Sequence, residues 1–524
     1  MLSPWRRVFL MAALAATPTH SFCQNVALDP ARVDVARWEG WGCSLSWWAV
    51  FTESWPDAAR KEACRRLFSR DPDALGLNIV RYNAGGTSVD ADRTPYRLGG
   101  AVLATLDRDG SWHPERDAAQ MDCLKLAKRF GADTFELFVN SPPYWMLKNG
   151  NTRGDDKGGE NLDRARVGDY ARWLVETARR TEETCGIRFA SIAPFNEPSA
   201  WWWNGKTGNQ EGCRLTWGAQ AEILRQLRAV LDRSGRRCTI AASDENGARE
   251  AYATLEWLTK PDRGDWSGGG LDARTLQRIN VHSYAGQDWQ ERLRTLAEQQ
   301  GIPGLWMSEV SHREMEGAGF VPNDMRCALP LTRSIVGDIR RLRCRAWVHW
   351  QPIEPLQYCI WYHYTYGLMP AAADKDVEWN GKTYRPGEFV VTKAFHAVRQ
   401  FTAFVRPGDR ILASNDLRTL AALSPNGEQA TVVVCNDTTN ALSYSFDLSA
   451  CGRMSGRVRA WRTSDDDALN CSPIPAPTAK DGRFTDALPP RSVTTYVVRL
   501  APGGMARDRR AEQGLRGRSG RFGE

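Results

Sequence analysis

The chain has 524 residues, of which 42% are hydrophobic and 25% charged, and its formal net charge is +7. This composition is typical of a globular protein and excludes a disordered or a membrane-embedded chain. Tryptophan is abundant, with 22 residues against 13 Tyr and 17 Phe. Indole rings suit a large core as well as a surface that stacks on sugar rings, so composition alone leaves both interpretations open.

The two ends of the chain carry most of the positive charge. Arg6 and Arg7 precede an apolar stretch from Val8 to Ala16, which is the layout of a secretory signal peptide. The stretch is too short to span a bilayer, and no later run reaches about 18 apolar residues. We therefore expect residues 1–23 to be removed and the protein to be secreted or periplasmic, without stable membrane insertion. The Arg- and Gly-rich tail, residues 501–524, is expected to be disordered, and nothing else indicates a nucleic-acid partner.

From residue 38 to residue 408, short apolar runs alternate with amphipathic segments such as residues 117–130. The apolar runs are residues 38–46, 77–83, 134–140, 189–196, 239–243, 279–284, 305–310 and 346–351. Eight strands that alternate with helices predict an α/β fold, a (β/α)8 TIM barrel whose reactive groups lie at the carboxyl ends of the strands. An open doubly wound sheet would need a Gly-rich phosphate loop after the first strand, and residues 40–43 are too bulky for one.

The pattern changes after a helix expected at residues 393–405. Short β-rich runs separated by turn residues follow, at residues 429–436, 441–448, 457–463 and 493–500. Their spacing predicts an attached side β-sandwich over residues 409–500. Residues 24–37 alternate apolar and polar side chains, and we expect them to form one edge strand that joins this sandwich.

Two glutamates at strand ends predict the functional site. The fourth run ends in Asn196-Glu197, followed by Pro198, and the seventh ends at Glu309. Strands four and seven of a barrel face each other across its mouth. Hydrolysis of a glycosidic bond needs such a pair, one carboxylic acid to protonate the leaving oxygen and one carboxylate to attack or stabilise the anomeric carbon. A single Glu at a strand end would more often form a salt bridge.

Other side chains at the barrel mouth are weaker candidates. Arg81 and Asn83 end the second run and Asn140 ends the third, and their roles in substrate contact or in structure are both open. Four tryptophans are candidate sugar platforms: Trp48, Trp145, Trp202 and Trp350. His282 suits a structural role as well as a substrate contact, and residues 244–246 favour a solvated loop. The thirteen cysteines show no metal-ligand spacing, their pairing is left open, and we expect neither a metal nor a cofactor.

Seven motifs follow one another in order along most of the chain. They are GWGCSLSWW (40–48), RYN (81–83), NSPPYWM (140–146), FNEP (195–198), WMSE (306–309), QFTAFVRPG (400–408) and LPPRSVTT (488–495). The ordered set resembles glycoside hydrolase family 30 of clan A, and most closely its endo-β-1,6-galactanase-like branch. Tyr144 stands where this resemblance leads us to expect Trp.

The resemblance implies a (β/α)8 barrel with a side β-sandwich, and hydrolysis with net retention of anomeric configuration. It implies Glu197 as the acid/base and Glu309 as the nucleophile. Asn196 would hydrogen-bond the sugar 2-hydroxyl group, and Tyr284 would hold Glu309 ionised and oriented.

We therefore expect a monomeric, retaining endo-β-1,6-galactanase acting on the galactan side chains of plant arabinogalactan. Another family 30 specificity is the alternative, namely a β-1,6-glucanase, a xylanase or a glucosylceramidase. Two further alternatives are a carbohydrate-binding protein without catalysis and a surface-interaction protein that uses the Arg-rich tail.

Overall fold

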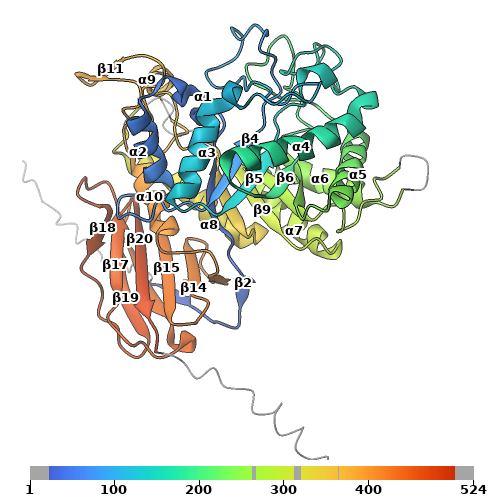
Figure 1. The fold of residues 1–524 in the computed structure, drawn as a ribbon. Coiled ribbons are helices and arrows are strands. Elements are labelled where there is room, and N and C mark those ends of the chain that lie inside the picture. The colour runs from blue at the N-terminus through green and yellow to red at the C-terminus, as the bar shows by residue number, and fades with distance from the viewer. Residues whose placement is uncertain (1–22, 263–266, 312–319, 364, 502–524) are drawn as a thin grey trace, which may run out of the picture.

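The computed structural model describes residues 23–262, 267–311, 320–363 and 365–501, so the expected signal peptide and tail lie almost wholly outside the described residues. Within these ranges, eight parallel strands close into a barrel, in chain order around the ring (Figure 1). The strands are β3 (Gly40–Ser44), β4 (Ile79–Asn83), β5 (Thr134–Phe138), β6 (Phe189–Ala193), β7 (Thr239–Gly247), β8 (Arg278–Ala285), β9 (Leu305–Val310) and β10 (Ala346–His349). The predicted (β/α)8 barrel is confirmed.

A helix follows each barrel strand and covers the outside of the barrel. These helices are α2 (Asp57–Phe68), α3 (Ala118–Phe130), α4 (Val167–Cys185), α5 (Trp217–Ser234), α6 (Ala248–Thr259), α7 (Gln290–Gln299), α8 (Leu329–Leu342) and α10 (Lys393–Thr402). Helix α5 shows the local signals clearly. The Thr216 side chain accepts a hydrogen bond from the Ala219 amide at its start, and Gly235, with φ 66°, ends it in the left-handed region.

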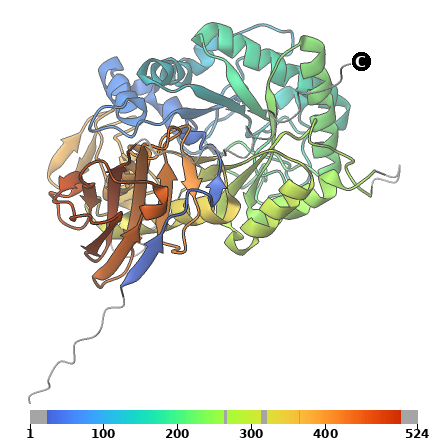
Figure 2. The ribbon, with the colours of Figure 1, turned by 90° about the horizontal axis from the view of Figure 1, so that it is seen from below.

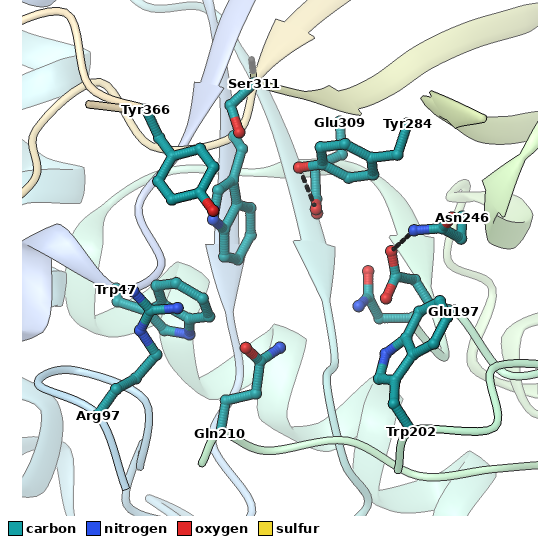
Figure 3. Close-up of a pocket in the computed structure, with 12 residues that line it drawn as sticks. Trp47, Arg97, Glu197, Trp202, Gln210, Asn246, Tyr284, Glu309, Ser311 and Tyr366 are labelled. Carbon is teal, nitrogen blue, oxygen red and sulfur yellow. Dashed lines mark hydrogen bonds between the residues drawn. The ribbon is translucent and has the colours of Figure 1, made fainter. Parts of the chain in front are cut away.

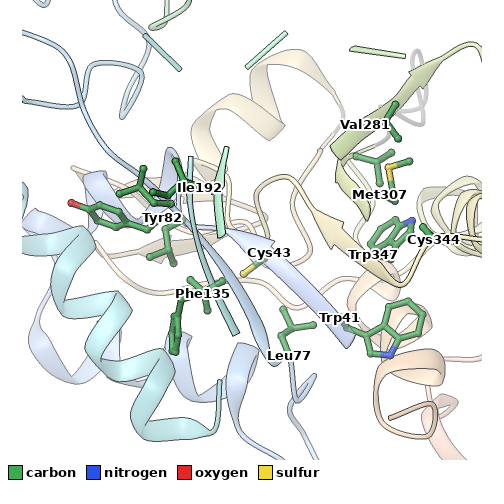
Figure 4. Packing of buried hydrophobic residues seen from close by; sticks show 14 of the residues in the cluster. Trp41, Cys43, Leu77, Tyr82, Phe135, Ile192, Val281, Met307, Cys344 and Trp347 are labelled. Carbon is green, nitrogen blue, oxygen red and sulfur yellow. The ribbon is translucent and has the colours of Figure 1, made fainter. Parts of the chain in front are cut away.

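Strand alternation separates the outside of the barrel wall from its inside. Cys43, Val281 and Met307 point outward and pack in one buried apolar cluster with the helices (Figure 4). The inside carries charge instead, because Arg81 donates to Glu136 at 2.9 Å with both side chains fully buried. The β8–β9 register shifts between Val281 and His282. Such an irregularity re-aims side chains, here at the strand end that carries Glu309.

The rest of the chain forms two facing sheets, which confirms the attached β-sandwich. In the described chain the larger sheet has the strand order β18-β17-β20-β15-β14-β13-β2 and the smaller has β1-β16-β19. Their bounds are β13 (Arg410–Leu412), β14 (Thr419–Leu423), β15 (Gln429–Asn436), β16 (Leu442–Asp447), β17 (Arg459–Thr463), β18 (Asn470–Ile474), β19 (Arg483–Leu488) and β20 (Ser492–Arg499).

The N-terminal segment expected as one edge strand forms two, one in each sheet. Strand β1 (Gln24–Ala27) pairs in parallel with β16, and β2 (Val33–Val35) pairs antiparallel with β13. Between them Arg32 N donates to Asp29 O at 3.0 Å in a turn that contains Pro30. Proline cannot continue a paired strand, so the segment breaks there and crosses between sheets.

The larger sheet lies between the smaller sheet and the barrel (Figure 2), and its strand β15 is buried on both faces. Along β15, Val432 and Val434 belong to the apolar core between the sheets, whereas Val433 and Cys435 belong to the core shared with the barrel. Gln400 of α10 fixes the junction with hydrogen bonds to Thr463 at 3.0 Å and from Thr495 at 2.6 Å. The sandwich is therefore packed firmly against the barrel's last helix.

All thirteen cysteines lie among the described residues and are free thiols, so the pairing left open by the sequence does not occur. Cys43 and Cys435 are buried, in keeping with their apolar segments. Within the described chain, every helix is too short or too polar to cross a membrane.

Candidate active site

A pocket opens at the carboxyl ends of the barrel strands (Figure 3). Six of its lining residues are ones that the sequence singled out: Asn196, Glu197, Trp202, Tyr284, Glu309 and Trp350. Six others complete it: Trp47, Arg97, Gln210, Asn246, Ser311 and Tyr366. Loops after β3, β4, β6, β9 and β10 contribute lining residues, and so do the ends of β7, β8 and β9, which is how a barrel of this kind builds a site.

Glu197 lies in a sharp turn just after β6. Its φ of 44° is in the left-handed region, which costs a residue with a side chain about 1–2 kcal/mol. Backbone hydrogen bonds hold it there, because its amide donates to Asp244 O at 2.8 Å and its carbonyl accepts the Trp203 indole N–H at 2.8 Å. The buried third tryptophan of the Trp201–Trp203 triplet therefore anchors the turn that presents the carboxylate.

The two oxygens of Glu197 have different surroundings. Oε1 accepts a hydrogen bond from Asn246 Nδ2 at 2.8 Å and lies 3.1 Å from His282 Nδ1. No donor among the described residues reaches Oε2. The second oxygen is therefore the one that can carry a proton to a bound molecule.

Glu309 faces donors from two strands of the barrel wall, β4 and β8. Its Oε1 accepts the Tyr284 hydroxyl at 3.0 Å, and its Oε2 lies 3.5 Å from Arg81 Nη1. Burial raises the pKa of Glu309 to about 7; the positive charges of His282 and Arg81 oppose this shift, and the nearby Glu197 reinforces it. The charge state of Glu309 therefore depends on the charges of its neighbours as well as on burial.

Hydrogen-bond partners favour Glu197 as the proton donor and Glu309 as the anion. Both Glu309 oxygens face donors, whereas Glu197 has one oxygen free to hold hydrogen. Protonation of Glu197 also removes the like charge that raises the pKa of its neighbour.

The spacing of the pair indicates the stereochemical course. One oxygen of each glutamate and a ring nitrogen of His282 lie within 4.8 Å of one another. Carboxyl groups about 5–5.5 Å apart suit a retaining reaction, whereas inversion needs about 6.5–9.5 Å to admit a water molecule. The site matches the retaining geometry.

His282 sits in the middle of the acidic groups and is itself fully buried. Burial disfavours its charge, but Glu309 and Asp244 outweigh that effect and raise its pKa to about 10. Its Nδ1 faces Glu197 and its Nε2 lies 3.3 Å from Asp244 Oδ1. The two ring nitrogens of His282 thus face acidic groups on opposite sides, which stabilises the charged imidazolium.

Asp244 and Asn246 correct the expectation of a solvated loop at residues 244–246. Strand β7 continues to Gly247, and this segment is buried or nearly so. Burial would raise the pKa of Asp244, but Arg81 and His282 outweigh it and hold that pKa well below its usual range. Arg81 donates to Asp244 directly and so links the charged barrel interior to the pocket.

Two of the candidate tryptophans are not in the pocket. Trp48 is fully buried in helix α1 (Trp48–Phe51), where its indole donates to Ser44 O at 2.8 Å. Its neighbour Trp47 lines the pocket instead and packs edge-on against Trp350, with ring centroids 4.9 Å apart. Trp145 lines a separate hollow beside Trp173, on the outer side of the barrel.

Asn83, Asn140 and Arg81 lie beneath the pocket, not in its lining. Asn83 is held by Gln120, which accepts from its backbone amide and donates to its carbonyl oxygen, both at 3.0 Å. Asn140 is 3% exposed. Arg81 reaches Glu309 from below, which makes it a supporting group for that carboxylate.

The closed barrel and its pair of facing carboxylates define the chain as an O-glycosyl hydrolase. The model of O-glycosyl hydrolase family 30 matches residues 26–265 of the chain.

Three proteins are similar to this chain in sequence or in structure. An endo-β-1,6-galactanase from Hypocrea rufa is 29% identical over 90% of this chain and 94% of its own length. An exo-β-1,6-galactobiohydrolase from Bifidobacterium longum subsp. longum is 22% identical over 84% of this chain, which spans 36% of that protein. The crystal structure of a conserved exported protein from Bacteroides fragilis has a TM-score of 0.73 at 19% identity, with 91% of this chain and all of that one covered.

Proposed function

We propose that the protein is a retaining endo-β-1,6-galactanase that cleaves β-1,6-galactan side chains of arabinogalactan. The single observation that carries the catalytic part is the spacing of Glu197 and Glu309, within 4.8 Å of each other and of His282. The Hypocrea rufa relative, similar along nearly its whole length, supports the substrate. The Bifidobacterium relative is named as an exo-acting enzyme and not an endo-acting one, but its name also refers to β-1,6-linked galactose.

In the first step Glu309 attacks the anomeric carbon and forms a glycosyl-enzyme ester. Glu197 Oε2 gives its proton to the departing glycosidic oxygen, so the leaving chain ends in a neutral hydroxyl group. In the second step the Glu197 carboxylate takes a proton from water, which displaces Glu309 from the anomeric carbon. Two inversions give net retention, and both glutamates return to their starting states.

The neighbouring side chains serve this cycle in distinct ways. Tyr284 and Arg81 stabilise the Glu309 carboxylate before attack and as it leaves the ester. Asn196 reaches the sugar 2-hydroxyl group in this scheme. Trp47, Trp350 and Trp202 supply flat apolar walls for the C–H faces of galactose.

The layout of residues 1–23 supports export of the protein to the periplasm or the medium, where a plant polysaccharide is met. We further propose that the mature protein acts as a monomer.

The test is a product profile on debranched arabinogalactan, with β-1,6-glucan and xylan as comparison substrates. We expect β-1,6-galacto-oligosaccharides of mixed length from the wild type and none from Glu309→Gln. Release of galactobiose alone from chain ends would indicate exo action. Preferential cleavage of glucan or xylan would indicate another family 30 specificity, and binding without products would indicate a carbohydrate-binding protein.

A further inference from the structure

The long loop between β10 and α10 carries a short helix whose outer side is aromatic. Helix α9 (Leu356–Tyr362) buries Leu356 and Cys359 on its inner side. Tyr358, Trp361 and Tyr362 follow the spacing i, i+3 and i+4, which places the three rings together on the opposite side. Trp361 is 70% exposed and Tyr362 is 44% exposed, so two large rings are open to solvent.

The three rings form one continuous surface, which we call the α9 platform. The ring centroids of Trp361 and Tyr362 are 4.7 Å apart, and their planes are tilted by only 32°. The ring of Tyr358 lies beside them, 6.2 Å from that of Tyr362. Apolar rings gain free energy when a ligand removes them from water, and an exposed patch of this kind marks a binding surface.

The backbone around α9 holds the platform in place. The Leu356 amide donates to Ala371 O at 2.7 Å, and the Leu368 amide donates to Pro352 O at 2.8 Å. The segments before and after the helix are thus joined beneath it. His363, with φ 62°, ends the helix in the left-handed region. The platform is therefore a fixed part of the loop.

The same loop reaches the catalytic pocket. Tyr366 lines that pocket (Figure 3), and the buried Glu354 carboxylate accepts its amide at 2.6 Å. Four residues of chain span at most about 14 Å, so Tyr362 lies within that distance of Tyr366. Figure 1 shows α9 at the same end of the barrel as α1, which follows β3. A polymer that leaves the pocket on this side passes close to the platform.

The chemistry of the platform suits a sugar chain. Flat aromatic rings stack on the C–H faces of sugar rings, and tyrosine hydroxyl groups exchange hydrogen bonds with sugar hydroxyl groups. An endo-acting enzyme leaves long stretches of its substrate outside the pocket. A chain that is already held in the pocket meets a second site at high effective concentration, so even a weak contact adds to the affinity.

We propose that the α9 platform is an accessory binding site for β-1,6-galactan outside the catalytic pocket. It holds the uncleaved part of the chain by stacking while another part of the same chain occupies the pocket. This inference rests on the proposed galactanase function for the identity of the sugar. It predicts a preference for long galactan over short oligosaccharides.

The test compares the polymer with a substrate too short to occupy both sites. The readout is the ratio of kcat/KM for debranched arabinogalactan over β-1,6-galactotriose. Trp361→Ala removes the largest ring and should lower this ratio about 5- to 30-fold, the usual effect of removing an aromatic anchor from a binding surface. The loss should come mainly from a higher KM for the polymer. Trp361→Phe keeps a ring and should restore part of the ratio.

Leu417→Ala is the matched control, because Leu417 is 75% exposed between β13 and β14 of the β-sandwich. It should leave the ratio unchanged. An unchanged ratio in Trp361→Ala would overturn the proposal. An equal loss on polymer and trisaccharide would overturn it as well, since Trp361 would then serve the fold or the pocket.

A second measurement separates this proposal from the galactanase function. Glu309→Gln binds without cleaving, so debranched arabinogalactan in a native gel should retard it. Adding Trp361→Ala should reduce the retardation, and adding Leu417→Ala should not.

Two parallel gels contain β-1,6-glucan and xylan. If the wild type cleaves no galactan but Trp361→Ala weakens retardation by one of these polymers, the galactanase function fails and the platform stands with that polymer as its ligand. If Trp361→Ala changes retardation in none of the three gels, the platform fails. It also fails if Trp361→Ala converts a dimer into a monomer in sedimentation, because the rings would then join two copies of the chain.

Discussion

Glu197 and Glu309 stand at one barrel mouth in opposite surroundings. Glu197 lies beyond the end of its strand, in a turn with φ 44°, and one of its oxygens has no donor within the described structure. Glu309 lies within β9, where Tyr284 and Arg81 face its two oxygens. The difference teaches that the division of labour is set by donors and not by burial, because the two residues are 7% and 5% exposed.

Replacing Glu309, the carboxylate that faces the donors, should have the largest effect on catalytic activity. Glu309→Gln removes the nucleophile, and kcat should fall on the order of 10⁴-fold or more on every substrate, whatever its leaving group. Steady-state kinetics on galacto-oligosaccharides and on an activated aryl galactoside measure this. Glu298→Gln, an exposed surface change on α7, is the control. Substantial activity in Glu309→Gln would contradict the assigned nucleophile.

Replacing Glu197, whose second oxygen has no donor among the described residues, should lower activity by an amount that depends on the leaving group. Glu197→Gln removes the proton donor, and natural substrates should lose about 10²–10⁴-fold in kcat/KM. A dinitrophenyl galactoside, whose leaving group needs no proton, should lose far less in its bond-cleavage step. An equal loss on both substrates would show that Glu197 is not the acid.

Removing one donor from Glu309 should make its hydrogen-bonding surroundings more like those of Glu197. Tyr284→Phe deletes the 3.0 Å hydrogen bond to Oε1, and kcat/KM should fall about 10- to 100-fold, the usual value of a hydrogen bond to a charged group. Tyr252→Phe on α6 is the matched control, since its hydroxyl meets only Glu256 among the described groups. Equal activity of the two variants would mean that Tyr284 does not act on the anion.

The pH dependence of activity should give the smallest effect that distinguishes the two glutamates. Because the pKa of Glu309 is raised to about 7, its carboxyl group is protonated below that pH and cannot attack the anomeric carbon. Activity on natural substrates should therefore fall about tenfold per pH unit below about 7. The dinitrophenyl galactoside should show the same acid fall, because its cleavage needs the same nucleophile, and a fall confined to natural substrates would assign it to another group.

Much of the fold and the two glutamates could be predicted from the sequence. Parallel strands buried on both faces appear as apolar runs, and a barrel gathers their carboxyl ends at one mouth. Asn196, Glu197 and Glu309 needed only those two facts. Tyr284 follows the same rule at the end of β8.

The positions of other site residues depend on three-dimensional geometry that the sequence pattern does not reveal. Trp47 and Trp48 are adjacent and chemically identical, and the start of α1 decides which one meets the pocket. Asn246 was expected in a solvated loop, whereas β7 continues beyond its apolar run through polar residues that find buried partners. Arg97 and Gln210 lie on long loops without periodicity, so only their hydrogen bonds to each other's segments bring them together.

The placement of β1 sets an order of events for the chain. Val26 pairs in register with Phe446, more than four hundred residues later, so no short fragment of the chain contains the whole smaller sheet. A nascent or exported chain must keep this first strand unpaired until almost its full length has emerged, and contacts so distant in sequence form slowly. Until then the smaller sheet has the β16 edge open, and a protein shortened before β1 pairs would expose that edge to other chains.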